Sequence, residues 1–215
     1  MKLIFYVLTF TVLLIPIYLH PTKIINKKNM PKKGTKCIVA SNHLSLWDAM
    51  LFHVYFFRRF RALAKKELYK NKLFTFVLRS LGGIPVDRDQ IAPSTYKETM
   101  SVLNKNKQLL IFPEGTRNKT ESEELQEAKT GLVLFASKSD SPIVPVVIYK
   151  KPRFFRKNYM IIGEPFKVIG ENPKRLTKEE IEQNIENYVN IMADLRRQLD
   201  ELVNSKKRKK KNIEK

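Results

Sequence analysis

The sequence predicts an α/β fold: a single domain with a central, largely parallel sheet covered by helices, plus an N-terminal hydrophobic membrane segment. Three observations support this prediction. The chain has 215 residues, which fits one domain because domains commonly run ~100–200 residues. Apolar, β-branched runs bounded by turn residues alternate with stretches of helical character, as in parallel sheets whose strands are connected by helices. An uncharged apolar run, Leu3–Leu19, precedes them.

Each apolar run bounded by turn residues is an expected strand. The expected strands are Lys36–Ala40, Phe60–Ala64, Ile84–Asp87, Gln108–Phe112, Ile143–Tyr149 and Tyr159–Ile162. The expected helices between them are Ser45–Phe57, Glu67–Leu81, Ser94–Asn104 and Gly131–Ser137. Beyond Pro173, Thr177-x-x-Glu180 is typical of a capping box, and apolar residues follow at helical spacing up to Leu202. We expect a long amphipathic helix there, with its apolar stripe packed on the core rather than inserted in a membrane.

The run Leu3–Leu19 would be about 25 Å long as a helix, against a hydrocarbon core of ~30 Å. A membrane anchor, an interfacial helix, a cleaved signal peptide and a buried core helix are the alternatives. The polar sequence His20-Pro21-Thr22-Lys23 follows in place of the small residues of a cleavage site, so we expect the run to be retained. The lysines beyond it place the rest of the chain on the cytoplasmic side of the cell membrane, by the positive-inside tendency.

This gives three expected regions. Residues 1–22 form an N-terminal membrane anchor or interfacial helix, residues 34–204 form the folded domain, and residues 205–215 form a basic disordered tail. The 41 lysines and arginines exceed the 21 acids, for a formal charge of +20. Such a field favours anionic partners, namely nucleic acid, phospholipid headgroups or acidic carrier proteins. The single cysteine, Cys37, excludes an intramolecular disulfide framework and a cysteine-ligated zinc site.

His43 and Asp48 lie five residues apart in NHLSLWD. Histidine can act as a general base near neutral pH, and a carboxylate bonded to its second nitrogen fixes the tautomer. Five residues on a regular helix are ~140° apart around the axis, so the pair would not share a helical face. Ser45-x-x-Asp48 is typical of a capping box, which would place His43 outside the helix and aim Asp48 back toward it. These residues alone leave open a catalytic pair or a helix cap beside a loop histidine. Asn42 adds a polar side chain beside His43, and the free backbone N–H groups of a helix start could stabilise an oxyanion.

Three further segments place polar residues at strand or helix ends. In FPEGTRN, a turn that Gly115 permits follows an apolar strand and leaves Glu114, Thr116 and Arg117 where α/β sheets bind ligands. An arginine there suits a phosphate, although pairing with a local acid is the alternative. Arg88 follows a short strand in GGIPVDRD, and Lys129 precedes a helix where an anion could meet its N-terminus.

Taken in this order, the segments resemble the glycerolipid acyltransferase family typified by 1-acylglycerol-3-phosphate acyltransferase. NHLSLWD resembles the family's NHxxxxD block, GGIPVDRD its arginine block, FPEGTRN its F-P-E-G-T-R block and SPIVPVVIY its proline-containing fourth block. The resemblance implies that His43 is the base and Asp48 its orienting partner. It also implies that Arg117, with Arg88, binds the acceptor phosphate, while Glu114 and Gly115 shape the acceptor pocket.

The expected function is transfer of a fatty acyl group from acyl-CoA or acyl carrier protein to the hydroxyl of a glycerol-phosphate-type acceptor. 1-Acylglycerol 3-phosphate (lysophosphatidate) is the leading acceptor, giving phosphatidate; glycerol 3-phosphate and other lysophospholipids are alternatives. No metal or cofactor is expected, because a thioester is already activated. The expected partners are a phospholipid bilayer, the lysophospholipid and the acyl donor, with no specific nucleic acid. The competing class is a non-catalytic basic membrane- or nucleic-acid-binding protein, which would leave the paired motifs unexplained.

Overall fold

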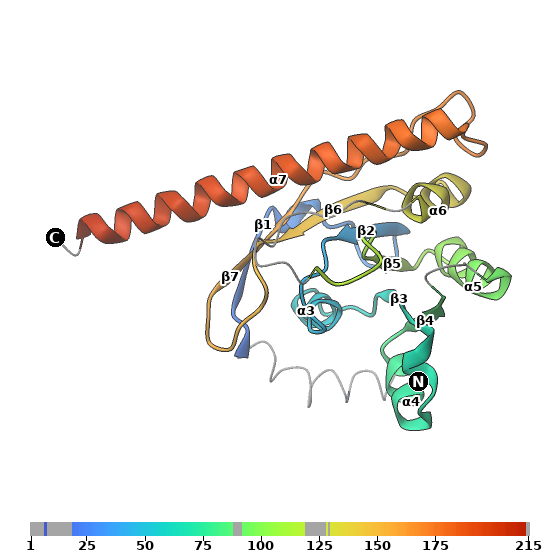
Figure 1. Cartoon of the computed structure of the whole chain (residues 1–215), viewed down its shortest axis with the longest axis horizontal. Helices are drawn as coiled ribbons and strands as arrows, with labels where there is room; N and C mark the ends of the chain where they lie inside the picture. The colour runs from blue at the N-terminus through green and yellow to red at the C-terminus, as the bar shows by residue number, and fades with distance from the viewer. Residues whose placement is uncertain (1–6, 8–18, 88–91, 119–127, 129, 214–215) are drawn as a thin grey trace.

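The computed structural model describes residues 7, 19–87, 92–118, 128 and 130–213. A seven-stranded sheet with the order β1-β7-β6-β2-β5-β3-β4 forms its centre (Figure 1). The strands are β1 (Thr22–Ile25), β2 (Cys37–Ser41), β3 (Arg61–Lys65), β4 (Gly83–Val86), β5 (Gln108–Ile111), β6 (Ile143–Ile148) and β7 (Asn158–Ile162). The α-helices are α3 (Asp48–Tyr55), α4 (Lys72–Ser80), α5 (Pro93–Asn104), α6 (Gly131–Ser139) and α7 (Lys178–Ile213), and the 3-10 helices are η1 (Lys27–Asn29) and η2 (Lys66–Tyr69).

The sheet is largely parallel, which confirms the prediction. Among the described strands, β6 and β7 pair antiparallel, and the other neighbouring pairs are parallel. The central strand β6, Ile143–Ile148, is apolar throughout, and every residue of it is buried. A continuous apolar run of this kind belongs to a strand that is covered on both faces.

Helices cover both faces of the sheet (Figure 1). On one face α5, α6 and α7 pack over the strands, and on the other α3 packs with the aromatic residues Phe52, Phe56 and Phe60. The amphipathic stripe of α7 lies on the core as predicted. Its buried apolar side chains, among the described residues, are Tyr188, Met192, Leu195, Leu199 and Val203.

Three regions differ from expectation here, and α3 is described with the site below. β1 pairs with β7, so the sheet begins at Thr22, ahead of the expected domain start at residue 34. The expected helix Glu67–Leu81 is divided into η2 and α4, because the Asn71 side chain accepts from the N–H groups of Leu73 and Phe74 and starts a new helix. The backbone is helical to Ile213, which corrects the expected disordered tail from residue 205. Lysine and arginine are good helix formers, so they extend a helix that has already begun.

The predicted N-terminal anchor falls mostly on residues 1–6 and 8–18, which lie outside the described residues. Within the described ranges, no helix combines the length and the apolar character needed to cross a membrane.

Candidate active site

Two neighbouring strands bring the two strongest motifs together. β2 and β5 run parallel, with Ala40 opposite Ile111, so their carboxyl ends lie side by side. NHLSLWD follows β2, and FPEGTRN follows β5. This is the edge where α/β sheets bind ligands. Residues that are about 70 positions apart in sequence therefore line one site.

His43 and Asp48 form a hydrogen-bonded pair. The His43 Nδ1 atom lies 2.9 Å from Oδ2 of Asp48. The Asp48 side chain is fully buried, and that of His43 is 13% exposed. Asp48 is the first residue of α3, where a negative charge suits the helix N-terminus. The chain turns between the two residues, as predicted, and this turn removes the obstacle that helical spacing presented.

One oxygen of Asp48 accepts three hydrogen bonds. Besides His43, the N–H groups of Leu44 and Ser45 each donate to Oδ2 at 2.7 Å. Backbone N–H groups are donors only, so they fix the position of this oxygen and require it to accept hydrogen bonds. His43 Nδ1 must then carry the hydrogen and donate a hydrogen bond to Oδ2 of Asp48. Nε2 is left as the unprotonated nitrogen that can act as a base.

The turn contains only one of the two hydrogen bonds of the predicted capping box. The Ser45 N–H donates to Asp48, but the Ser45 hydroxyl accepts from the Trp47 N–H, at 3.3 Å, instead of from the Asp48 N–H. The helix starts at Asp48 and ends at Tyr55, which is shorter than the expected Ser45–Phe57. Because the N–H groups of Leu44, Ser45 and Trp47 are used within the turn, they are not the free oxyanion donors that the sequence suggested.

Asn42 holds the end of β2 to β6. Its side-chain amide donates to the Ile148 carbonyl at 2.9 Å, and its side-chain oxygen accepts from the Ile148 N–H at 2.8 Å. These two hydrogen bonds continue the pairing of β2 with β6 beyond the end of β2, with the Asn42 side chain in place of backbone groups. Asn42 is buried, so its polar atoms stabilise the fold and are not directed at an oxyanion.

The segment after β5 holds the ring and backbone of His43. The Phe112 ring stacks on the imidazole with centroids 4.1 Å apart. The His43 carbonyl accepts from the Asn118 N–H at 2.7 Å, and the His43 N–H donates to Oε2 of Glu114 at 3.4 Å. These contacts restrict the ring to one orientation, which is what a general base requires.

The FPEGTRN segment forms the turn that the sequence predicted. The Gly115 N–H donates to the Phe112 carbonyl at 3.0 Å, and Gly115 has φ = 72°, a conformation that glycine adopts at low cost. Glu114 is buried. Burial raises the pKa of Tyr188 on α7, and the nearby carboxylate of Glu114 raises it further. Thr116 and Arg117 are exposed beyond the turn.

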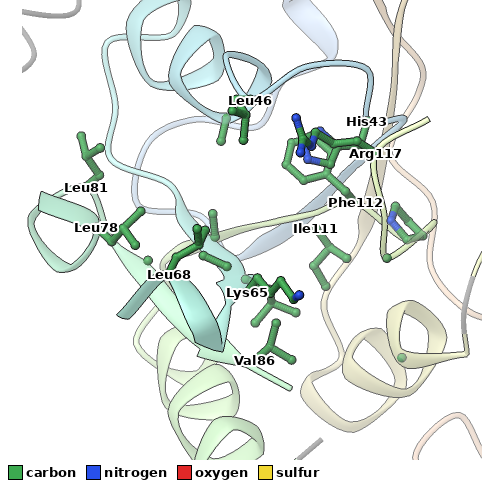
Figure 2. A pocket seen from close by; sticks show the side chains of 18 of the residues that line it. His43, Leu46, Lys65, Leu68, Leu78, Leu81, Val86, Ile111, Phe112 and Arg117 are labelled. Carbon is green, nitrogen blue, oxygen red and sulfur yellow. The ribbon is translucent and has the colours of Figure 1, made fainter. Parts of the chain in front are cut away.

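A cavity of about 370 Å³ adjoins this pair of motifs. Figure 2 shows His43 and Arg117 at one end of it and Leu78 and Leu81 at the other. Most of its lining is apolar, and Gly115 also lines it. The arrangement offers a base and a cation at one end of an apolar space. Among the described residues, no three metal-ligating side chains lie together.

The structure places six of the eight residues predicted for the site. His43, Asp48, Glu114, Gly115, Thr116 and Arg117 lie around the ends of β2 and β5, whereas Arg88 and Lys129 fall outside the described residues. Sequence reasoning missed Phe112 and Asn118 as supports of His43. Their place in FPEGTRN identifies them only once β5 is known to lie beside β2, because the segments after two neighbouring strands lie close together.

Two other reactive side chains near the site are structural. Cys37 is buried on β2, and burial raises the pKa of its thiol to about 12, so it is not a nucleophile near neutral pH. His53 on α3 lies with Nδ1 and Nε2 each 2.7 Å from a carbonyl, those of Ala49 and Leu81. Burial outweighs these two bonds and lowers the pKa of His53.

Comparison with known proteins identifies the family of the chain. A family model described as Acyltransferase matches residues 21–149. The chain is 30% identical over 184 residues to the 1-acyl-sn-glycerol-3-phosphate acyltransferase of Borreliella burgdorferi, covering 84% of this chain and 72% of that protein. It is 33% identical over 150 residues to the enzyme of that name from Bacillus subtilis, covering 66% of this chain and 72% of that protein.

A solved structure is similar as well. The crystal structure of PlsC, the 1-acyl-sn-glycerophosphate (LPA) acyltransferase of Thermotoga maritima, matches with a TM-score of 0.62 and 26% sequence identity. The match covers 84% of this chain and 71% of that one. The sequence motifs, the paired His43 and Asp48 and these similarities all lead to one assignment. The chain belongs to the glycerolipid acyltransferase family typified by 1-acylglycerol-3-phosphate acyltransferase, and it is an O-acyltransferase.

Proposed function

We propose that the chain transfers a fatty acyl group from a thioester to the free hydroxyl of 1-acylglycerol 3-phosphate, giving phosphatidate. The observation that carries this proposal is the hydrogen bond between His43 and an Asp48 oxygen that two backbone N–H groups hold in place. The pair lies beside an apolar cavity that Arg117 also lines. The lysophosphatidate hydroxyl requires a base, its phosphate requires a cation, and an acyl chain requires an apolar space. The site offers all three.

In the mechanism, His43 Nε2 removes the proton from the acceptor hydroxyl as the oxygen attacks the thioester carbonyl. Asp48 stabilises the imidazolium that forms and keeps the proton on Nδ1. The tetrahedral intermediate then collapses, the carbon–sulfur bond breaks, and the proton on Nε2 passes to the departing thiolate. Atoms balance without an acyl-enzyme. General-base assistance typically contributes 10²–10⁴-fold, so positioning of the two substrates supplies much of the remaining acceleration.

The acceptor is assigned through its phosphate. Arg117 stands exposed at the end of the cavity that holds His43, where its guanidinium can make two charge-assisted bonds to a phosphate. We propose that Arg88 and Lys129 add to this site and that Thr116 contributes a hydroxyl. The relatives named 1-acyl-sn-glycerol-3-phosphate acyltransferase support lysophosphatidate over glycerol 3-phosphate or another lysophospholipid. Membership of the family favours the enzyme over a non-catalytic binder of lipid or nucleic acid.

The acyl donor is proposed to be acyl-CoA or acyl carrier protein. Both are anionic, and the formal charge of +20 attracts either one. The thioester is already activated, so the reaction needs no metal or other cofactor. We further propose that Leu3–Leu19 holds the chain at the cell membrane with the catalytic domain on the cytoplasmic side, where the donor and the lipid acceptor meet.

The decisive experiment is thiol release by His43→Ala with lysophosphatidate and an acyl-CoA. We expect turnover to fall by about 10³-fold or more, within the upper range of general-base effects, while the variant remains folded and bound to vesicles. A His43→Ala variant that retains wild-type turnover would contradict the mechanism. Mass spectrometry of the products from lysophosphatidate, glycerol 3-phosphate and lysophosphatidylcholine identifies the acceptor, and acyl-CoA measured against acyl carrier protein identifies the donor.

A further inference from the structure

The loop between β6 and β7, Lys150–Lys157, presents two phenylalanines to solvent; we call it the docking loop. Phe154 is 56% exposed and Phe155 is 76% exposed. The loop contains no acidic residue. Its basic residues are Lys150, Lys151, Arg153, Arg156 and Lys157, all exposed. Phenylalanines surrounded by cations suit the boundary between headgroups and acyl chains of an anionic bilayer, where rings are buried and cations meet phosphates.

The backbone holds Phe155 in an unfavourable conformation at the tip of the loop. Phe155 has φ = 57°, and the Arg156 N–H donates to the Arg153 carbonyl at 3.2 Å across the turn. A bulky residue with positive φ is uncommon, and such strain concentrates at positions with a function. Here the strained turn presents a large apolar ring that is mostly exposed in the part of the chain that the structure describes.

Ring contacts through His20 connect the docking loop to the turn between His43 and Asp48. The Phe155 N–H donates to the carbonyl of Leu19, the last residue of the apolar run, at 2.6 Å. The Phe154 ring lies 4.9 Å from the His20 ring, and His20 lies 5.6 Å from the ring of Trp47, the neighbour of Asp48 in sequence. These contacts fix the position of the docking loop relative to His43 and Asp48. A bilayer or other surface that binds the loop therefore lies at a defined distance from the catalytic pair.

A second apolar surface lies on α4. Leu73 is 70% exposed, Phe74 59% and Phe76 50%. Lysines flank this surface in sequence at Lys65, Lys66, Lys70 and Lys72. Leu78, on the same helix, lines the cavity beside His43. In Figure 1 the docking loop and α4 both lie along the lower side of the molecule, whereas α7 runs along the upper side.

We propose that the docking loop and α4 together seat the folded domain on an anionic phospholipid bilayer. Basic residues would attract several polyanions, but the exposed phenylalanines and leucine favour a partner with an apolar interior. A bilayer offers anionic phosphates and an apolar interior at the depths that these side chains reach. The surface belongs to the folded domain, so it acts in addition to Leu3–Leu19 and does not depend on which acceptor the enzyme uses.

Site-specific fluorescence on the full chain tests this proposal. Cys37 is buried and its thiol pKa is raised to about 12, so a thiol reagent labels an introduced cysteine in preference to it. Phe155→Cys and Phe74→Cys each carry an environment-sensitive fluorophore. Ile169→Cys is the matched control, because Ile169 is 75% exposed and its N–H donates to Asn184 of α7, at the opposite side of the domain. Vesicles contain phosphatidylcholine with or without phosphatidylglycerol, and a spin-labelled lipid serves as quencher.

With phosphatidylglycerol vesicles, the probes at positions 155 and 74 should shift to the blue and be quenched by the spin-labelled lipid, while the probe at 169 is unchanged. Phe154→Ala/Phe155→Ala should lower vesicle partitioning by at least about tenfold, because two rings lose their burial, whereas Ile169→Ala should not. Arg153→Ser and Lys157→Ser should each lower partitioning to anionic vesicles about fivefold and leave partitioning to phosphatidylcholine vesicles unchanged, and high salt should abolish the effect. Lys97→Ser and Lys178→Ser, at exposed positions on α5 and α7, are the charge controls.

Several results would overturn the proposal. Vesicle-bound protein whose probe at position 155 stays in water shows that another face docks. A blue shift that is present before vesicles are added shows that another part of the chain covers the loop, and a shift that depends on protein concentration shows a second copy. Thiol release from monomeric short-chain substrates without vesicles measures the proposed reaction in the absence of a bilayer, so it separates a failure of docking from a failure of the proposed function. Phe155→Ala should retain that activity, and loss of it would assign Phe155 to the reaction instead of to docking.

Discussion

Asp48→Asn separates two tasks of the Asp48 side chain, which are to orient His43 and to stabilise its positive charge. The Oδ2 position faces the N–H groups of Leu44 and Ser45, so the oxygen of an asparagine must occupy it, because an NH₂ group there would meet two donors. That oxygen would still accept from His43 Nδ1. The tautomer should therefore be retained and only the negative charge lost.

The expected loss follows from the strength of the bond. A hydrogen bond to a charged group contributes about 1.5–3 kcal/mol and a neutral one about 0.5–1.5 kcal/mol, so losing the charge costs about 1–2 kcal/mol. This lowers kcat roughly 5- to 30-fold, since about 1.4 kcal/mol is tenfold. A wrong tautomer costs about 10⁴-fold in other histidine-dependent enzymes. The new NH₂ group would occupy the position of Oδ1, a buried atom with no hydrogen-bond partner in the described residues, which destabilises the fold by about 1–3 kcal/mol.

The assay is thiol release under saturating substrates, with the melting temperature measured in parallel. Asp140→Asn is a suitable control, because Asp140 is an exposed carboxylate at the C-terminal end of α6 with φ = 47°, a conformation that asparagine tolerates. If Asp48→Asn is as slow as His43→Ala although folded, then the amide has the opposite orientation and the reasoning about the tautomer is wrong.

Three other predictions follow from single residues. Arg117→Ala should lower kcat/KM for lysophosphatidate about 10- to 100-fold, because it removes a charge-assisted hydrogen bond to the phosphate, and Arg117→Lys should restore part of this loss. An equal loss of kcat/KM for uncharged monoacylglycerol would refute phosphate binding. His53 has a lowered pKa when folded, so the unfolded chain binds more protons and the free energy of unfolding should decrease as the pH falls below about 6.5. Urea unfolding at several pH values should show that His53→Asn flattens this decrease, and an unchanged slope would assign it to other groups. Cys37→Ala should keep turnover within about threefold, because its buried thiol stays protonated; loss of turnover in the folded variant would implicate the thiol in catalysis.

Much of the sheet could be predicted because its central strands are fully buried. Strands such as Ile143–Ile148 are continuous apolar runs, and no competing pattern obscures them. β1 was missed because Thr22–Ile25 is short, half exposed and set among lysines, so only its pairing with β7 identifies it. The division before α4 could have been foreseen from Asn71, a strong N-cap residue, although the apolar residues on both sides concealed it.

The pairing of His43 with Asp48 was predictable, but its support was not. Two residues that are five positions apart can contact each other only if the chain turns between them. The capping-box pattern of Ser45 and Asp48 predicted that turn. The contacts from Phe112 and Asn118 depend on which strand lies beside β2, and that neighbour is set by the long-range order of the sheet. Likewise, Asn42 could not be separated from the catalytic residues in sequence, since only the distant Ile148 shows that its amide is used in the fold.

The pairing of β1 with β7 also affects folding during synthesis, because β1 is made long before its partner strand. About 130 residues separate Ile25 from Asn158, the nearest part of the partner strand. At synthesis rates of about 5–20 residues per second, β1 leaves the ribosome roughly 7–26 seconds before β7 exists. Throughout that interval the backbone groups of β1 have no ladder to join, and an unpaired strand can bind other chains. Early capture of the preceding apolar run at a bilayer would hold neighbouring nascent chains apart until the last strand arrives.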